Sequence, residues 1–145
     1  EISLGLVGSE MCIRDSYKTN STSNLLAEKY RFKEGITYTE LTSSVNTFRY
    51  LPPVCIFDKK GPSIVSVKKL WYCLGIFGTK IAPLYFAILN PTLSTQVRDV
   101  KNLPIIVNGE IEPKIDEIVK ENVEICKQDW NDFETSWGFE KHPLI

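Results

Sequence analysis

The chain has 145 residues, of which 43% are hydrophobic and 24% are charged, so it fits one ordinary globular domain that needs no disulfide or metal staple. Its net charge of −1 conceals an asymmetry between two parts. Residues 17–109 carry twelve Lys or Arg against five Asp or Glu, whereas residues 110–145 carry four against ten. This asymmetry indicates a part that faces a polyanion beside a separate solvated part, although ordinary surface charge explains it equally well.

The first sixteen residues, EISLGLVGSEMCIRDS, resemble the translation of a sequencing adapter, and we exclude them from the predicted fold. A signal peptide is the alternative, but no basic segment precedes the short apolar run. Three cysteines then remain, Cys55, Cys73 and Cys126, beside a single histidine, His142. Their wide spacing argues against a structural zinc site, and unpaired cysteines predict a reducing, cytoplasmic location.

Four short strands are predicted in the basic part of the chain. Alternation of apolar residues with threonine favours a strand at 36–41, and a second is predicted at 47–51, before Pro52-Pro53. A third is predicted at 54–57, ahead of a turn at 58–62, and a fourth at 63–67. Together they predict a small antiparallel sheet.

Residues 70–89 form the most apolar stretch, LWYCLGIFGTKIAPLYFAIL, whose length invites a transmembrane interpretation. Lys80 lies at its centre, where membrane insertion costs about 2.5–3.5 kcal/mol. Gly75, Gly78 and Pro83 favour two helical pieces with a break between them. We therefore predict a buried helix or helix pair packed on the sheet, and no membrane partner.

Asn90-Pro91 is expected to end that element, and residues 96–106 are predicted to be extended. Pro113 then opens a long helix at a first-turn position. Apolar residues recur in steps of four and three from Val119 to Trp137, which is typical of a one-sided helical stripe. The predicted fold class is α+β: a small antiparallel sheet packed on an apolar helix or helix pair, followed by a long amphipathic C-terminal helix.

The sequence contains only incomplete matches to known catalytic and cofactor-binding motifs. Asn90-Pro91-Thr92-Leu93 begins like the Asn/Asp-Pro-Pro-aromatic loop that holds a flipped base, but Thr92 replaces the second proline and Leu93 has no aromatic face. Gly75-Ile76-Phe77-Gly78 lacks the G-x-G-x-x-G spacing and the preceding strand of a cofactor-binding turn. We therefore predict no catalytic, cofactor-binding or metal-binding residue in this chain.

Basic residues interleave with aromatic residues along the predicted strands and turns. The candidates for binding double-stranded DNA are Lys33, Arg49, Lys59, Lys60, Lys68 and Arg98. Such side chains can neutralise phosphates, and arginine can read guanine edges. Composition alone favours the alternative that the aromatic residues are core and the lysines are solvated.

Three segments resemble, in order and spacing, the adenine-specific DNA methyltransferases of type 1 BREX phage-exclusion systems. They are EGITYTELTSSVNTFRYLPPVCIFDKKGPS, ILNPTLSTQVRDVKNLPII and DWNDFETSWGFEKHPLI, and the resemblance covers Lys33 to Ile145. The third is the most specific, since its Trp-Asn-Asp-Phe-Glu-Thr-Ser-Trp string is improbable by chance. Departures such as Arg98, where the family has glycine, blur the boundary with type IIG restriction-methylation enzymes.

The resemblance implies a much longer enzyme that transfers a methyl group from S-adenosylmethionine to N6 of adenine, with its catalytic and cofactor sites outside this chain. Residues 17–109 would be part of a target-recognition or specificity-like segment, and residues 110–145 a helix leading into the next domain. The expected function is a DNA-recognition or spacer segment, inactive alone, whose partners are double-stranded DNA and other phage-defence proteins. Two alternatives stay open. One is the specificity region of a type IIG enzyme, and the other is a non-catalytic protein-interaction module whose stripe from Val119 to Trp137 docks a partner helix.

Overall fold

The computed structural model describes residues 27–57, 60–65, 67–136 and 138–142. The adapter-like residues 1–16 and most of the polar loop expected after them lie outside these ranges. The chain divides into two compact units, with the boundary between Arg31 and Phe32. The described part of the first unit contains a short 3₁₀ helix, η1 (Glu28–Tyr30), in which the ammonium group of Lys29 lies 4.8 Å from the centre of the Tyr30 ring.

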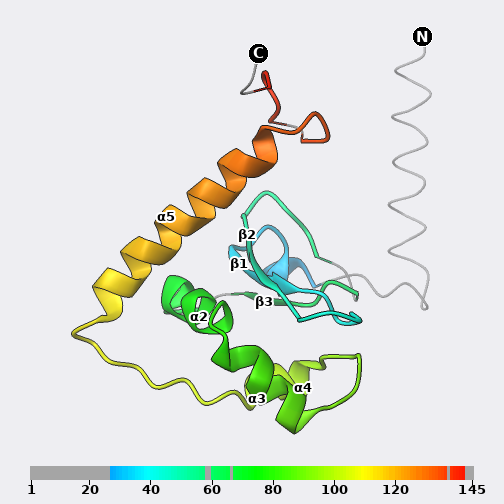
Figure 1. Cartoon of the computed structure of the whole chain (residues 1–145), viewed down its shortest axis with the longest axis vertical. Helices are drawn as coiled ribbons and strands as arrows, with labels where there is room; N and C mark the ends of the chain where they lie inside the picture. The colour runs from blue at the N-terminus through cyan, green and yellow to red at the C-terminus, as the bar shows by residue number, and fades with distance from the viewer. Residues whose placement is uncertain (1–26, 58–59, 66, 137, 143–145) are drawn as a thin grey trace. The chain divides into compact units, whose positions relative to one another are not determined.

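The second unit contains an antiparallel sheet of three strands in the order β2-β1-β3 (Figure 1). The strands are β1 (Gly35–Tyr38), β2 (Phe48–Leu51) and β3 (Ser63–Val65). Ile36 of the central strand lies opposite Tyr50 on one side and Ile64 on the other, and Tyr38 lies opposite Phe48. Because side chains alternate across a strand, these apolar side chains share one face. The predicted antiparallel sheet is confirmed.

Helices cover that apolar face. They are α2 (Leu70–Phe77), α3 (Ile81–Leu89), α4 (Val97–Lys101) and α5 (Glu112–Asn131). Helix α2 packs across β1 and β2, and aromatic rings fill the space between the layers. The Phe48 ring stacks on Phe77 with centroids 4.5 Å apart, and on Phe86 of α3 at 5.7 Å. The predicted α+β class, with an apolar helix pair on the sheet, is therefore confirmed.

Helix α3 is buried along one side only. Ala82 and Phe86 belong to the core, while Ile81, Leu84 and Ile88 are exposed. No single helix in the described ranges is long and apolar enough to cross a membrane. Helices α2 and α3 reach the required length only as a pair, and the pair is bent by 74° at the break between them.

Two segments predicted to be extended have a different structure. Residues 54–57 do not form a strand, because Cys55 N–H turns back to the carbonyl of Pro52 at 3.1 Å and the segment pairs with no neighbouring strand. Residues 97–101 form α4, since the side chains of Gln96 and Asp99 bond reciprocally to each other's backbone N–H groups in a capping box. Local capping therefore outweighs the weak preference of valine for strands in this short segment.

The long amphipathic C-terminal helix is confirmed as α5, with Pro113 in its first turn. It ends at Asn131, so Phe133 lies beyond the helix, and Trp137 lies outside the described residues. The helix packs closely on α2. A Cβ atom placed on Gly75 would lie 2.8 Å from Val119 Cγ2, so glycine is what permits this approach of the two helices.

Candidate nucleic-acid interface

The face of the sheet that points away from the helices carries polar side chains. Thr37 of β1, Arg49 of β2 and Ser63 of β3 lie side by side in the strand register. The alternation that sends Ile36 and Tyr38 into the core necessarily sends these three residues to the opposite face. Arg49 is exposed there. An arginine among hydroxyl groups on a small sheet can contact nucleic acid, because strands can enter a groove and reach base edges.

Two of the predicted basic residues are held near the end of β1, one on each side of the strand. Arg49 Nη2 donates a hydrogen bond to Thr39 Oγ1 at 2.6 Å, and Lys60 Nζ lies 3.4 Å from Glu40 Oε2. Arg49 belongs to β2 and Lys60 to the segment before β3, so the two cations approach the end of β1 from its two sides. The Lys60 side chain is 75% exposed, so this ion pair contributes little to stability. Burial, and secondarily the charge of Glu40, raises the pKa of the neighbouring Tyr38 to about 12.

The other candidate residues are dispersed. Lys33 and Lys68 are exposed beyond the opposite end of β1, where Gly35 pairs with Val65. Arg98 is exposed on α4, and a backbone hydrogen bond of 2.8 Å from Thr95 N–H to the Glu40 carbonyl ties the preceding segment to the end of β1. Lys59 lies outside the described residues. The structure therefore holds Arg49 and Lys60 at one end of β1 and leaves Lys33 and Lys68 beyond the other end.

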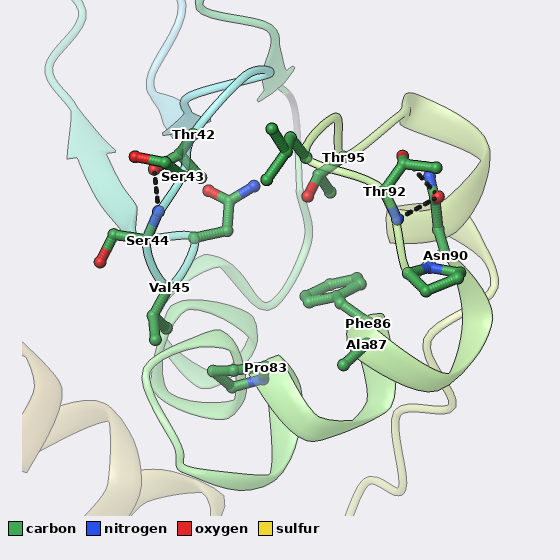
Figure 2. Close-up of a pocket in the computed structure, with 13 residues that line it drawn as sticks. Thr42, Ser43, Ser44, Val45, Pro83, Phe86, Ala87, Asn90, Thr92 and Thr95 are labelled. Carbon is green, nitrogen blue, oxygen red and sulfur yellow. Dashed lines mark hydrogen bonds between the residues drawn. The ribbon is translucent and has the colours of Figure 1, made fainter.

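An open cleft of about 460 Å³ lies between the loop 42–46 and the segment from Pro83 to Thr95. Figure 2 shows the Phe86 ring pointing toward the loop that carries Thr42 and Val45. Hydroxyl and amide groups are mixed with apolar side chains in its lining, and none of the lining side chains is charged. The cleft includes Asn90, the first residue of the loop that resembles a base-binding motif.

The Asn90 side chain is fully occupied in holding its own loop. Its Nδ2 donates hydrogen bonds to the Ser94 carbonyl and to Asp99 Oδ2, both at 2.8 Å. Its Oδ1 accepts from the Thr92 backbone N–H at 3.2 Å and from the Thr92 hydroxyl at 2.7 Å (Figure 2). These bonds use both donors and the acceptor of the amide. Asn90 therefore links the end of α3 to the start of α4, which is a structural role.

Asp99 is the charged residue at the centre of this link. Its side chain is buried, with 3% of the residue exposed, and its Oδ2 also accepts from Gln96 N–H at 2.9 Å. The hydrogen bond from Asn90 holds the pKa of Asp99 below its usual value, against the opposing effect of burial, and the bond from Gln96 and the charge of Arg98 act in the same direction as Asn90. The carboxylate is thus stabilised in its ionised form.

Asp99→Ala is expected to lower the free energy of unfolding at pH 7 by about 0.5–2 kcal/mol, the usual effect of removing a helix cap. Because the folded-state pKa is lowered, the contribution of Asp99 is present above the unfolded value near 3.9 and is lost as the pH falls through the folded pKa. Urea unfolding at pH 7 and pH 3 measures this dependence. The difference between wild type and variant should narrow at pH 3, and an equal difference at both pH values would contradict the assignment.

The glycine pair at 75 and 78 does not fit an S-adenosylmethionine site. Gly75 lies inside α2 and faces Val119, and Gly78 is the C-cap of the same helix. A donor-binding turn needs glycines between a strand and a helix, where the backbone can approach the ligand. Among the described residues there is also no group of three or more His, Cys, Asp or Glu side chains placed to hold a metal ion.

Sequence reasoning missed the residues that position the basic side chains. Thr39 and Glu40 are separated from their partners by ten and twenty residues, and no local pattern encodes such contacts. The link between Asn90 and Asp99 was also missed, although the spacing of Gln96 and Asp99 is that of a capping box. The atypical glutamine at the first position concealed this pattern.

Comparison with known proteins shows which proteins this chain resembles in sequence. The chain is 32% identical over 127 residues to the adenine-specific methyltransferase BrxX of Escherichia coli O9:H4 (strain HS), a match that covers 85% of the chain and 10% of that protein. It is 29% identical over 119 residues to the adenine-specific methyltransferase PglX of Lacticaseibacillus casei (strain Zhang), covering 81% of the chain and again 10% of that protein. The chain is similar to one segment of adenine-specific methyltransferases. The resemblance indicated by the three sequence segments is confirmed.

The chain spans about a tenth of the length of these methyltransferase relatives. No protein-family model matches it. The methyltransferase match extends across most of the chain, so it includes at least part of the sheet, the helix pair and α5 rather than one isolated motif.

Proposed function

We propose that the chain is a DNA-recognition or spacer segment of a longer adenine-specific (N6) DNA methyltransferase that serves a phage-defence system. The observation that carries this proposal is the match of most of the chain to a tenth of two such methyltransferases. In this proposal the longer enzyme takes the methyl group from S-adenosylmethionine at a site outside the chain, and the segment itself performs no chemistry. The enzyme acts in the cytoplasm, where the host DNA is, together with other phage-defence proteins.

The charge asymmetry supports a specific orientation on DNA. The proposed contact surface comprises Arg49 and Lys60 at the end of β1, with Thr37 and Ser63 beside Arg49 on the sheet. Residues 110–145 are acidic, with ten Asp or Glu against four Lys or Arg, and phosphates repel them. Helix α5 therefore lies away from the duplex while the polar face of the sheet approaches it.

A salt series on the intact chain tests this function. If Arg49 and Lys60 each neutralise a phosphate, the affinity for a duplex should fall about 12-fold between 50 and 200 mM salt. Fluorescence anisotropy of a labelled 20-base-pair duplex measures the affinity at each concentration. Absent or salt-independent binding by the folded chain would contradict the proposal.

Arg49→Ala is expected to weaken duplex binding about tenfold, because the guanidinium is exposed on the proposed contact surface and Thr39 holds it in position. Arg49→Lys separates two roles of this side chain. Lysine keeps the charge but loses the planar fork, so retained affinity indicates a phosphate contact and lost affinity indicates a base contact. Lys114→Ala, which removes one exposed charge from α5, is the matched control and should leave binding unchanged.

One observation favours a second candidate function, a protein-interaction module. Ile125 and Trp130 of α5 and the following Phe133 are all exposed, and exposed apolar patches often mark protein contacts. A module of this kind would show no salt-dependent affinity for DNA, so the salt series distinguishes the two candidates.

A further inference from the structure

Arg49 differs from the other basic residue at the end of β1 in the kind of group that holds it. Its Nη2 donates to the Thr39 hydroxyl, which carries no charge, and it forms no ion pair with any of the described residues. Lys60, by contrast, lies 3.4 Å from the Glu40 carboxylate. The guanidinium of Arg49 is therefore held in one orientation while its charge stays uncompensated.

The residue that holds Arg49 is itself fixed on the sheet. Thr39 directly follows β1, and its carbonyl accepts a hydrogen bond of 3.0 Å from Asn46 Nδ2. Backbone hydrogen bonds to the segment before β3 continue one residue past Thr39, so the alternation of the strand continues there too. Thr39 lies two residues after Thr37, so its side chain shares the polar face of the sheet with Arg49. The Thr39 hydroxyl is therefore an acceptor at a fixed position beside the guanidinium.

The hydrogen bond to Thr39 leaves one complete donor pair of the guanidinium available. A guanidinium has two edges that each carry two N–H donors side by side, and Nη2 contributes one proton to each edge. Donation to Thr39 uses one of these two protons, so the other edge keeps both of its donors. Because Arg49 is exposed, a ligand with two neighbouring acceptors can bind that edge.

The surroundings of Arg49 favour a base edge over a row of phosphates as this ligand. Thr37 and Ser63, which lie beside Arg49 in the strand register, carry hydroxyl groups. Glu40 and Lys60 form an ion pair, so Arg49 is the one uncompensated charge among these side chains. Proteins that follow the phosphate backbone do so with several cations, whereas a single arginine can make a bidentate contact with one base. Guanine presents O6 and N7 side by side in the major groove, which strands can enter.

We propose that Arg49 reads a guanine in the major groove of the duplex, with the free edge of its guanidinium donating to O6 and N7. Thr39 is the positioning residue that fixes this edge. The inference rests on the proposed function and names the base that the contact surface recognises. A guanidinium in the groove stays close to the phosphates on both sides, and the exposed Lys60 side chain can reach one of them, so binding remains dependent on salt.

Replacing guanine with 7-deazaguanine tests the contact without changing the charge of the duplex. The modified base keeps O6 and its Watson–Crick pairing, but a C–H group stands in place of N7. Duplexes of mixed sequence offer guanine in every helical turn, so the target site need not be known. The intact chain is expected to bind guanine duplexes about fivefold more tightly than the same duplexes made with 7-deazaguanine, as measured by fluorescence anisotropy at one salt concentration.

Variants of Thr39 distinguish positioning from a general effect on the fold. Thr39→Val keeps the shape of the side chain but removes the acceptor, so the preference for guanine should disappear while the affinity for 7-deazaguanine duplexes stays unchanged. Thr39→Ser keeps the hydroxyl and should keep the preference. Thr135→Val, which removes an exposed hydroxyl beyond the end of α5, is the matched control and should also keep it. Thermal unfolding of each variant checks that the fold is intact.

The wild-type comparison can overturn the proposal without any variant. Equal affinity for the two kinds of duplex, with salt dependence intact, would exclude the guanine contact and leave the proposed function standing. A preference for guanine that survives in Arg49→Ala would assign the contact to another residue, and one that survives in Thr39→Val would remove the role of Thr39. Either result overturns the proposal. If the folded chain binds neither duplex, the proposed function itself fails, and the guanine contact fails with it.

Discussion

Ile36→Ala is expected to lower the free energy of unfolding by about 2–5 kcal/mol, the range for truncating a large buried aliphatic side chain. Ile36 is 0% exposed and lies in the central strand, opposite Tyr50 and Ile64. Alanine would leave a cavity between the sheet and α2, and the stacked aromatic rings nearby can fill it only by breaking their own contacts. Urea unfolding followed by far-ultraviolet circular dichroism measures the loss.

Val54→Ala is the matched control for this variant. It truncates another β-branched residue, but Val54 is 78% exposed in the segment that follows β2. The change should stay within about 0.5 kcal/mol. Similar losses for the two variants would contradict the position of Ile36 at the centre of the core.

Gly75→Leu is expected to lower the free energy of unfolding by about 1–3 kcal/mol through overpacking between α2 and α5. A Cβ at this position would already lie 2.8 Å from Val119 Cγ2 and 3.3 Å from Ile115 Cγ2. Valine has a stiff side chain, so it cannot rotate freely away from the added atoms. Leucine itself favours helix, so the loss reflects the steric contact rather than helix propensity.

Two further variants separate this steric effect from other causes. Gly78→Leu places the same side chain at the exposed end of α2, where a Cβ would lie 3.4 Å from the Leu74 carbonyl oxygen, and it should be nearly neutral. Val119→Ala removes the atom that Gly75 faces, so Gly75→Leu should cost less in that background. Equal costs of Gly75→Leu in both backgrounds would show that α5 does not press on α2 at this point.

The sheet could be predicted from sequence because its pattern is local. Ile36 and Tyr38 alternate with Thr37 and Thr39, and a period of two assigns each side chain to a face before any partner is known. Residues 54–57 are even more apolar but form no strand, because a strand also needs a neighbour with which to pair. Pairing partners are distant in sequence, so composition could not distinguish the two segments.

The candidate interface was predictable in composition but not in arrangement. Arg49 and Lys60 were recognisable as basic residues near aromatic ones, yet their positions depend on Thr39 and Glu40, to which they bond from other parts of the chain. Residues 97–101 fall in a segment predicted to be extended, whereas the capping box decides their local structure and they form α4. The positions of the basic side chains and the helix α4 were therefore missed because they depend on hydrogen bonds between residues that are not adjacent in sequence.

The strand order also determines when the sheet can form during synthesis of the chain. The central strand β1 is synthesised first, and both of its partners and the helix that covers it follow later in the sequence. At about 5–20 residues per second, synthesis from Tyr38 to the end of α2 takes roughly 2–8 s. During that interval Ile36 and Tyr38 lack the neighbours that later bury them. The core between the sheet and α2 therefore cannot close until α2 has been synthesised.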